Sequence, residues 1–125
     1  MKTYLVFNTD GEVTSFKTNI VTFNLDIFKL YHFKDSNINY TSKSISYNNE
    51  LFILLYDSSS TTKNITSLPF INYINGDFIL IKVDENNTIK SITENNLYKI
   101  IDKNYKLFYK NNKNNDIDYS SEDFD

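Results

Sequence analysis

The sequence of 125 residues contains no cysteine, arginine, tryptophan, alanine or glutamine, and it has only two glycines, one proline and one histidine. Without cysteine the chain can form neither a disulfide nor a thiolate metal site, and small secreted domains often depend on disulfides. We therefore expect an intracellular protein. Two glycines are too few for a Gly-rich phosphate-binding loop.

Long hydrophobic runs are also missing. No segment approaches the roughly 20 apolar residues that a membrane-spanning helix needs. The first apolar run, residues 4–7, is followed at once by Asn8 and is too short for the core of a signal peptide. We expect neither a signal peptide nor a membrane segment.

Apolar and aromatic residues are abundant. Hydrophobic residues make up 40% of the chain, and the 10 tyrosines and 10 phenylalanines favour a folded domain over a disordered chain. The length indicates one domain. All 13 basic residues are lysines, and asparagine, isoleucine, lysine and tyrosine, which have A/T-rich codons, dominate the sequence. An AT-rich genome therefore explains part of the lysine content without any functional demand.

Several stretches predict strands joined by tight turns. Residues 2–7 and 12–17 flank Asp10-Gly11, which is a strong hairpin signal because glycine accepts a positive φ. Residues 77–83 and 88–92 flank the polar turn 84–87 and predict a second hairpin. Residues 44–47 form a further strand candidate, and residues 51–56, which are apolar on both faces, predict a central strand. Residues 35–41 and 57–64 are polar and predict connections.

Two helices are expected. Asn24 is a candidate N-cap for a helix that continues to Phe33. A second helix begins near Glu94 after the N-cap candidate Thr93, and its apolar residues line up on one side. The opposite side carries lysines spaced four, three, four and three residues apart. These are candidates for binding a polyanion, although a solvated helix face is the simpler explanation: Lys99, Lys103, Lys106, Lys110 and Lys113.

The last residues differ in kind from the body. Residues 1–115 hold 13 lysines against 11 acids, whereas residues 116–125 hold five acids and no lysine. A mixture of acidic and apolar residues is typical of disordered docking segments. The candidate partner-docking residues are Asp116, Asp118, Tyr119, Glu122, Asp123, Phe124 and Asp125.

No arrangement of residues predicts catalysis. His32 is the only imidazole, it lies between Tyr31 and Phe33, and no nucleophile signature accompanies it, so we expect a structural or surface histidine. The residues that start at Asp84 suggest a calcium-binding loop. However, Ile89 stands where such a loop requires glycine, and Asn95 stands where it requires glutamate. We therefore predict no catalytic, cofactor-binding or metal-binding residues, and no enzyme.

Several short stretches of the chain carry a resemblance to known proteins: residues 4–11, 27–34, 51–56, 68–71, 76–80, 92–93, 98–101 and 120–123. Their order resembles that in a group of small, uncharacterised, acidic-tailed proteins of nucleocytoplasmic large DNA viruses. The resemblance implies a viral origin, and such proteins carry no established activity that could be assigned to residues here. The chain departs from the pattern because its proline cluster is reduced to Pro69 and an aromatic Gly-Gly segment is missing.

These observations predict an α+β domain over residues 1–113 and a disordered acidic tail over residues 114–125. We expect a mostly antiparallel sheet of about five strands with two helices on one face. The expected function is a non-enzymatic protein-interaction module whose tail docks on a protein partner, in the cytoplasm or nucleus of a host cell or in a virion. The alternative is a single-stranded nucleic-acid-binding protein whose tail screens the lysine face. An inhibitor that offers the tail as a nucleic-acid mimic is a third hypothesis.

Overall fold

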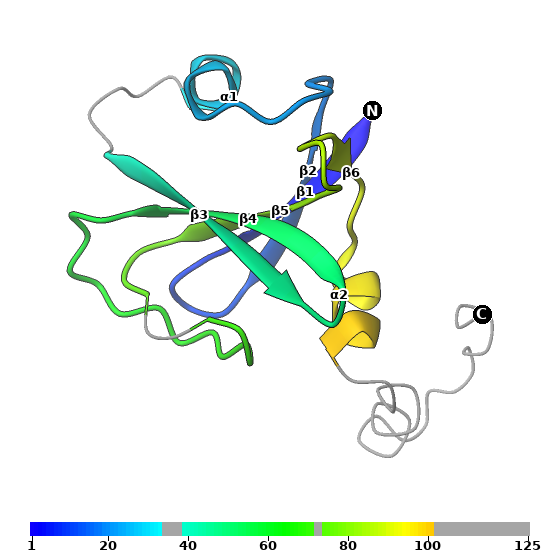
Figure 1. Ribbon diagram of the computed structural model, residues 1–125. Helices are drawn as coiled ribbons and strands as arrows, with labels where there is room; N and C mark the ends of the chain where they lie inside the picture. Colours follow the sequence, from blue (N-terminus) through cyan, green and yellow to red (C-terminus); the bar gives the residue numbers. More distant parts are fainter. Residues whose placement is uncertain (34–38, 72–73, 102–125) are drawn as a thin grey trace.

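A single antiparallel sheet forms the centre of the molecule (Figure 1). The computed structural model describes residues 1–33, 39–71 and 74–101. Five strands lie in the order β2-β1-β5-β4-β3, and a short sixth strand pairs with β5. The strands are β1 (Lys2–Phe7), β2 (Val13–Thr18), β3 (Tyr40–Tyr47), β4 (Glu50–Asp57), β5 (Phe78–Val83) and β6 (Ile89–Lys90), and the helices are α1 (Leu25–His32) and α2 (Glu94–Ile101).

Tight turns explain three of the strand pairs. Gly11, with φ of +91°, closes the β1–β2 hairpin, and Asn48 and Asn49 take positive φ values of 51° and 66° between β3 and β4. Asparagine tolerates this left-handed conformation better than most residues. Asp84 closes the β5–β6 turn by accepting hydrogen bonds from the backbone N–H groups of Asn86 and Thr88. Both hairpins predicted from the sequence are confirmed.

Strands β4 and β5 are buried on both faces of the sheet. Along β4, Phe52 and Leu54 belong to one core cluster, while Ile53 and Leu55 belong to the other. This alternation follows from the two-residue repeat of a strand. Because both faces are apolar, each needs its own cover.

The two helices supply cover on opposite faces. Phe28 of α1 packs in the cluster that contains Tyr4, whereas Leu97 of α2 packs in the cluster that contains Leu5. The predicted antiparallel sheet with two helices is therefore confirmed. The expectation that both helices share one face was wrong, because a sheet with two apolar faces cannot be covered from one side.

The predicted N-caps are present at both helices. The Asn24 side chain accepts a hydrogen bond from the Ile27 N–H at 3.1 Å, and the Thr93 hydroxyl accepts one from the Asn96 N–H at 3.2 Å. The part of the second predicted helix after Ile101, and the tail, lie outside the described residues. Strand β3 begins at Tyr40, earlier than predicted. In the described ranges no helix has the length and apolar character required to cross a membrane.

Candidate protein-interaction surface

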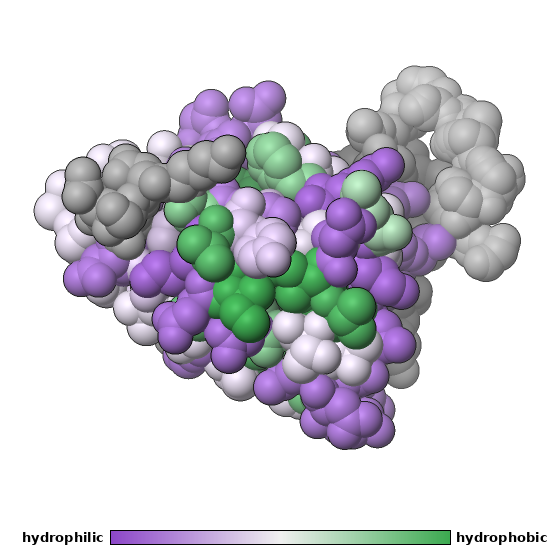
Figure 2. Space-filling view, turned by 90° about the horizontal axis from the view of Figure 1, so that it is seen from above, coloured by the Kyte–Doolittle hydropathy of each residue, from purple (hydrophilic) through white to green (hydrophobic). Residues whose placement is uncertain are grey.

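The outward side of α1 carries large apolar side chains that face solvent. Ile27, Leu30 and Tyr31 are 47%, 74% and 67% exposed, and their spacing of three and four residues places them on one side of the helix. Val21, in the segment that leads into α1, is 66% exposed. Figure 2, which views the molecule from above, shows hydrophobic residues in a band across this face. We call these four residues the α1 surface.

Packing beneath α1 fixes the orientation of this surface. Phe28 is fully buried, and its ring meets the ring of Tyr4 edge-on at 5.2 Å between centroids. Phe23 lies 5.8 Å from the same ring on the N-terminal side. After the helix, Phe33 stacks on Tyr40 of β3 at 4.5 Å. Since the inner side is held by aromatic contacts at both ends, the outer side projects in a defined direction.

His32 takes part in this inner packing. Its Nε2 lies 2.7 Å from the Thr18 hydroxyl oxygen, and its ring contacts Tyr4 and Phe28 at 5.4 and 4.6 Å. Burial lowers the pKa of His32, which favours the neutral ring. The Thr18 oxygen also accepts a hydrogen bond from the Ile20 N–H at 3.1 Å. Thr18 is only 1% exposed, so a substrate could not reach its hydroxyl. The contact between His32 and Thr18 is therefore a packing contact and not a nucleophile with its base.

Charged residues of α1 are arranged by sign along its axis. Asp26 lies in the first turn and Lys29 in the last. This order suits the helix dipole, whose N-terminal end favours a negative group and whose C-terminal end favours a positive one. It also means that the two ends of the helix are electrostatically different, which restricts how a partner can pair with it.

The residues predicted from the sequence to bind a polyanion or a partner fall mostly beyond the part described. Lys99 lies in α2, near its C-terminal end. The remaining lysines of the row and the acidic tail lie outside the described residues: Lys103, Lys106, Lys110, Lys113, Asp116, Asp118, Tyr119, Glu122, Asp123, Phe124 and Asp125. The structure therefore leaves both predictions untested.

Two acidic residues of the described part, Asp57 and Asp84, accept hydrogen bonds that hold turns. Asp84 caps its hairpin and lies 3.9 Å from the Lys90 ammonium, and its backbone hydrogen bond from Thr88 contributes most to lowering its pKa. Asp57 accepts hydrogen bonds from both the hydroxyl and the N–H of Ser59, which lower its pKa. Among residues 1–33, 39–71 and 74–101, no group of three His, Asp or Glu side chains is gathered that could hold a metal ion.

The α1 surface was not predicted from the sequence. Helical spacing places Phe28 on the inner side, whereas Ile27, Leu30 and Tyr31 face solvent. A usable signal was present, since an eight-residue helix with apolar residues on more than half of its circumference has more apolar area than one sheet face can cover.

Comparison of the chain with protein-family models, with curated proteins and with solved structures gave no match.

Proposed function

We propose that this chain is a non-enzymatic protein-interaction module in which α1 pairs with α1 of a second copy and the acidic tail docks on a different protein. The observation that carries the proposal is the exposure of Ile27, Leu30 and Tyr31 on one side of a helix. Single exposed apolar residues are ordinary, but an apolar cluster on a fixed helix face marks interaction sites.

Self-complementarity favours a second copy of the chain as the occupant. An antiparallel pairing of two α1 helices brings the first turn of one, which holds Asp26, beside the last turn of the other. The helix dipoles are also antiparallel, which is favourable. A two-fold axis between Phe28 and Lys29 places Ile27 against Leu30 of the other copy. Such self-complementarity is what an isologous interface requires.

The pairing is expected to be weak and reversible. Eight helical residues span about 12 Å, so the contact buries less area than the roughly 800 Å² per partner of a standard interface. A weak dimer would still present two tails to one target, and two linked tails bind with a higher effective concentration than one. Residues 116–125 are the proposed docking segments, and the proposed setting is the inside of a host cell or a virion.

Sedimentation of the full chain over a range of concentrations tests the proposal. We expect a monomer–dimer equilibrium that Leu30→Glu abolishes, because each dimer would bury two added charges. Ile65→Glu is the matched control, since Ile65 is 66% exposed on another surface. The pairing is wrong if the wild-type chain stays monomeric at all concentrations, or if both substitutions weaken association equally.

Substitution of the tail identifies a competing occupant. If Tyr119→Ser with Phe124→Ser abolishes association while Leu30→Glu does not, the tail and not α1 joins the two copies, and the α1 pairing is refuted. Four of the five lysines on which the nucleic-acid alternative rests lie outside the described residues, so the α1 surface is the stronger support and favours protein interaction.

A further inference from the structure

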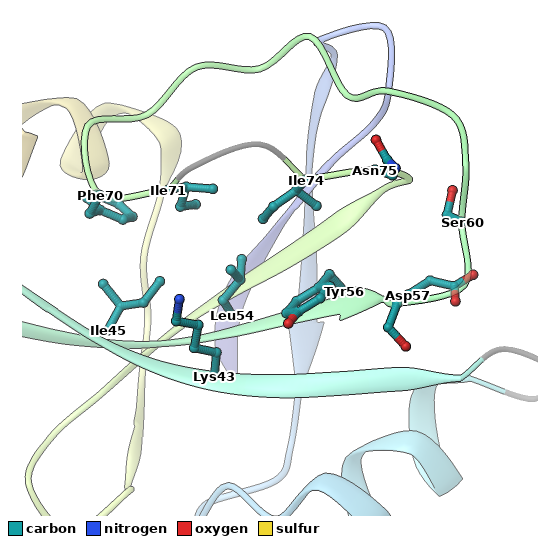
Figure 3. A pocket seen from close by; sticks show the side chains of 11 residues that line it. Lys43, Ile45, Leu54, Tyr56, Asp57, Ser60, Phe70, Ile71, Ile74 and Asn75 are labelled. Atoms are coloured by element: carbon teal, nitrogen blue, oxygen red, sulfur yellow. The ribbon is translucent and has the colours of Figure 1, made fainter.

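A second surface feature is a cleft on the face of the sheet that carries α2. It has a volume of about 280 Å³ and lies between strands β3 and β4 and the loop that connects β4 to β5. Figure 3 shows Ile45, Leu54 and Lys43 on the strand side, with Phe70, Ile71 and Ile74 on the opposite wall. The volume is just below the range of about 300–1,000 Å³ for small-molecule sites.

The apolar wall of the cleft is held in place from behind. The ring of Phe70 stacks on the buried Phe52 with centroids 5.4 Å apart and planes 8° apart. Tyr47 contacts the same ring at 5.1 Å. The Ile71 N–H donates a hydrogen bond to the Leu68 carbonyl at 3.1 Å, and Leu68 is buried. The wall is therefore preformed, which lowers the entropy cost of binding.

Lys43 supplies the positive charge of the cleft. It is the only Lys among the described residues that line the cleft, and Figure 3 shows its ammonium directed into the space below Phe70 and Ile71. The ion pairs found in the described part are Lys82 with Glu50 and Lys90 with Asp84, so Lys43 has no carboxylate partner there. A cation beside an apolar wall can bind an anion that carries an apolar body.

Asp57 sets a limit at the other end of the cleft. In the strand register Lys43 lies opposite Leu54, three residues before Asp57, so the backbone positions of the two residues are separated by about 10 Å along the strand. The hydrogen bonds from Ser59 lower the pKa of Asp57 and keep its carboxylate ionised. A negative group at this end repels a second anionic group on a ligand.

We propose that this cleft binds a small monocarboxylate, with the carboxylate at Lys43 and a branched or aromatic apolar body among Leu54, Ile71 and Ile74. The proposal is independent of the pairing through α1, because α1 lies on the opposite face of the sheet. The same chemistry is offered by a free carboxylic acid and by the C-terminal residue of a peptide that ends in leucine.

Titration of the full chain, followed by the NMR methyl signals of Ile45, Leu54 and Ile74, tests this site. The probes are 4-phenylbutyrate and its neutral amide, together with N-acetyl-Gly-Leu as a peptide C-terminus. We expect the acid to bind at least tenfold more tightly than the amide. The better of the two carboxylate probes identifies the source of the ligand, and the absence of binding by both overturns the proposal.

Two substitutions assign the binding to the cleft. Lys43→Met should weaken carboxylate binding at least tenfold, whereas Lys17→Met, which removes an exposed lysine from the other edge strand, should leave it unchanged. Asp57→Asn should improve the binding of phenylsuccinate, a dicarboxylate, more than that of the monocarboxylate. Equal affinity of acid and amide, or unchanged binding by Lys43→Met, would refute the assignment.

Discussion

The side-chain amide of Asn64 donates a hydrogen bond to the carbonyl oxygen of Gly76 at 2.8 Å, and this bond closes the loop between β4 and β5. The same Nδ2 donates to the Phe7 carbonyl at 3.1 Å, and Oδ1 accepts from the Thr66 N–H at 2.9 Å. Asn64 is only 5% exposed. One buried side chain thus ties the loop to itself and to the end of β1.

We expect Asn64→Ala to lower the free energy of unfolding by about 2–4 kcal/mol, because it leaves two carbonyls and one N–H without their partner in a buried site. Urea unfolding followed by circular dichroism measures the loss. Asn19→Ala is the control, since Asn19 is exposed and should change stability by less than about 0.5 kcal/mol. Equal effects of the two substitutions would show that the Asn64 hydrogen bonds contribute little.

Gly76 cannot accept a side chain without strain. Its φ is +82°, and a Cβ atom there would lie 2.8 Å from both the Cβ and the Oγ of Ser60. At Gly11, with φ of +91°, the nearest atom to an added Cβ is the flexible Cδ1 end of Ile65 at 3.3 Å. The left-handed backbone penalises alanine at both positions, by about 1–2 kcal/mol, but the clash exists only at Gly76.

Gly76→Ala should therefore destabilise the fold by about 1–2 kcal/mol more than Gly11→Ala, as an order-of-magnitude estimate for overpacking. Removing the Ser60 side chain tests the cause. In the Gly76→Ala background, Ser60→Gly should recover the part due to the clash and leave the backbone part. If Ser60→Gly recovers nothing, the contact with Ser60 is not the source of the difference.

Local signals were sufficient to predict most elements of the fold. Asp10-Gly11, the two-sided apolar strand at residues 51–56 and the Asn24 cap each depend on a few neighbouring residues, and each is confirmed. The side on which each helix packs depends on contacts between distant segments. A sheet that is apolar on both faces offers no local preference, so the sequence could not distinguish one shared face from two.

The candidate sites were less predictable because they also depend on contacts between segments that are distant in the sequence. Residues 57–64 are polar and predict a connection, yet Asn64 is buried because its side chain hydrogen-bonds to the carbonyl of Phe7, which is 57 residues earlier in the chain. Lys43 is one of 13 lysines, and its neighbours in the sequence do not distinguish it from the others. Its position in the cleft arises only when β3 pairs with β4 and the following loop folds over them.

Stability should depend on the charge of His32. Burial lowers the pKa of this ring below its value of about 6.5 in the unfolded chain. The unfolded state therefore binds the proton more readily, so the contribution of neutral His32 is complete above about pH 6.5 and is lost as the pH falls through the lower folded pKa. The groups in contact with the ring are Tyr4, Thr18 and Phe28.

Urea unfolding at several pH values between about 7.5 and 5 measures this dependence in the wild type and in His32→Gln. The wild type should lose stability on acidification faster than the variant. The difference between the two pH profiles gives the contribution of His32 to the pH dependence of the free energy of unfolding. Thr18→Val checks the role of the hydrogen bond, because loss of the hydroxyl partner should change the folded pKa of His32 in an NMR titration. Parallel pH profiles for wild type and His32→Gln would contradict the expected shift.

The nucleic-acid alternative makes a prediction that separates it from protein interaction. If the lysine row contacts phosphates, a labelled single-stranded oligonucleotide should bind the full chain with an affinity that falls steeply as salt rises. Lys103→Glu with Lys110→Glu should abolish binding, as measured by fluorescence polarisation. Lys17→Glu with Lys43→Glu makes the same change in net charge on the two edge strands and should have a smaller effect.

Conversion of the five tail carboxylates to amides tests the proposed screening. If the tail covers the lysine row, these substitutions should tighten oligonucleotide binding at low salt, because the internal competitor is removed. If the two double lysine-to-glutamate variants lose oligonucleotide binding equally, the effect is one of general charge and the chain has no defined site. If neither the wild type nor the tail variant binds at low salt, the alternative is eliminated, and the tail is left with a protein partner as its proposed target.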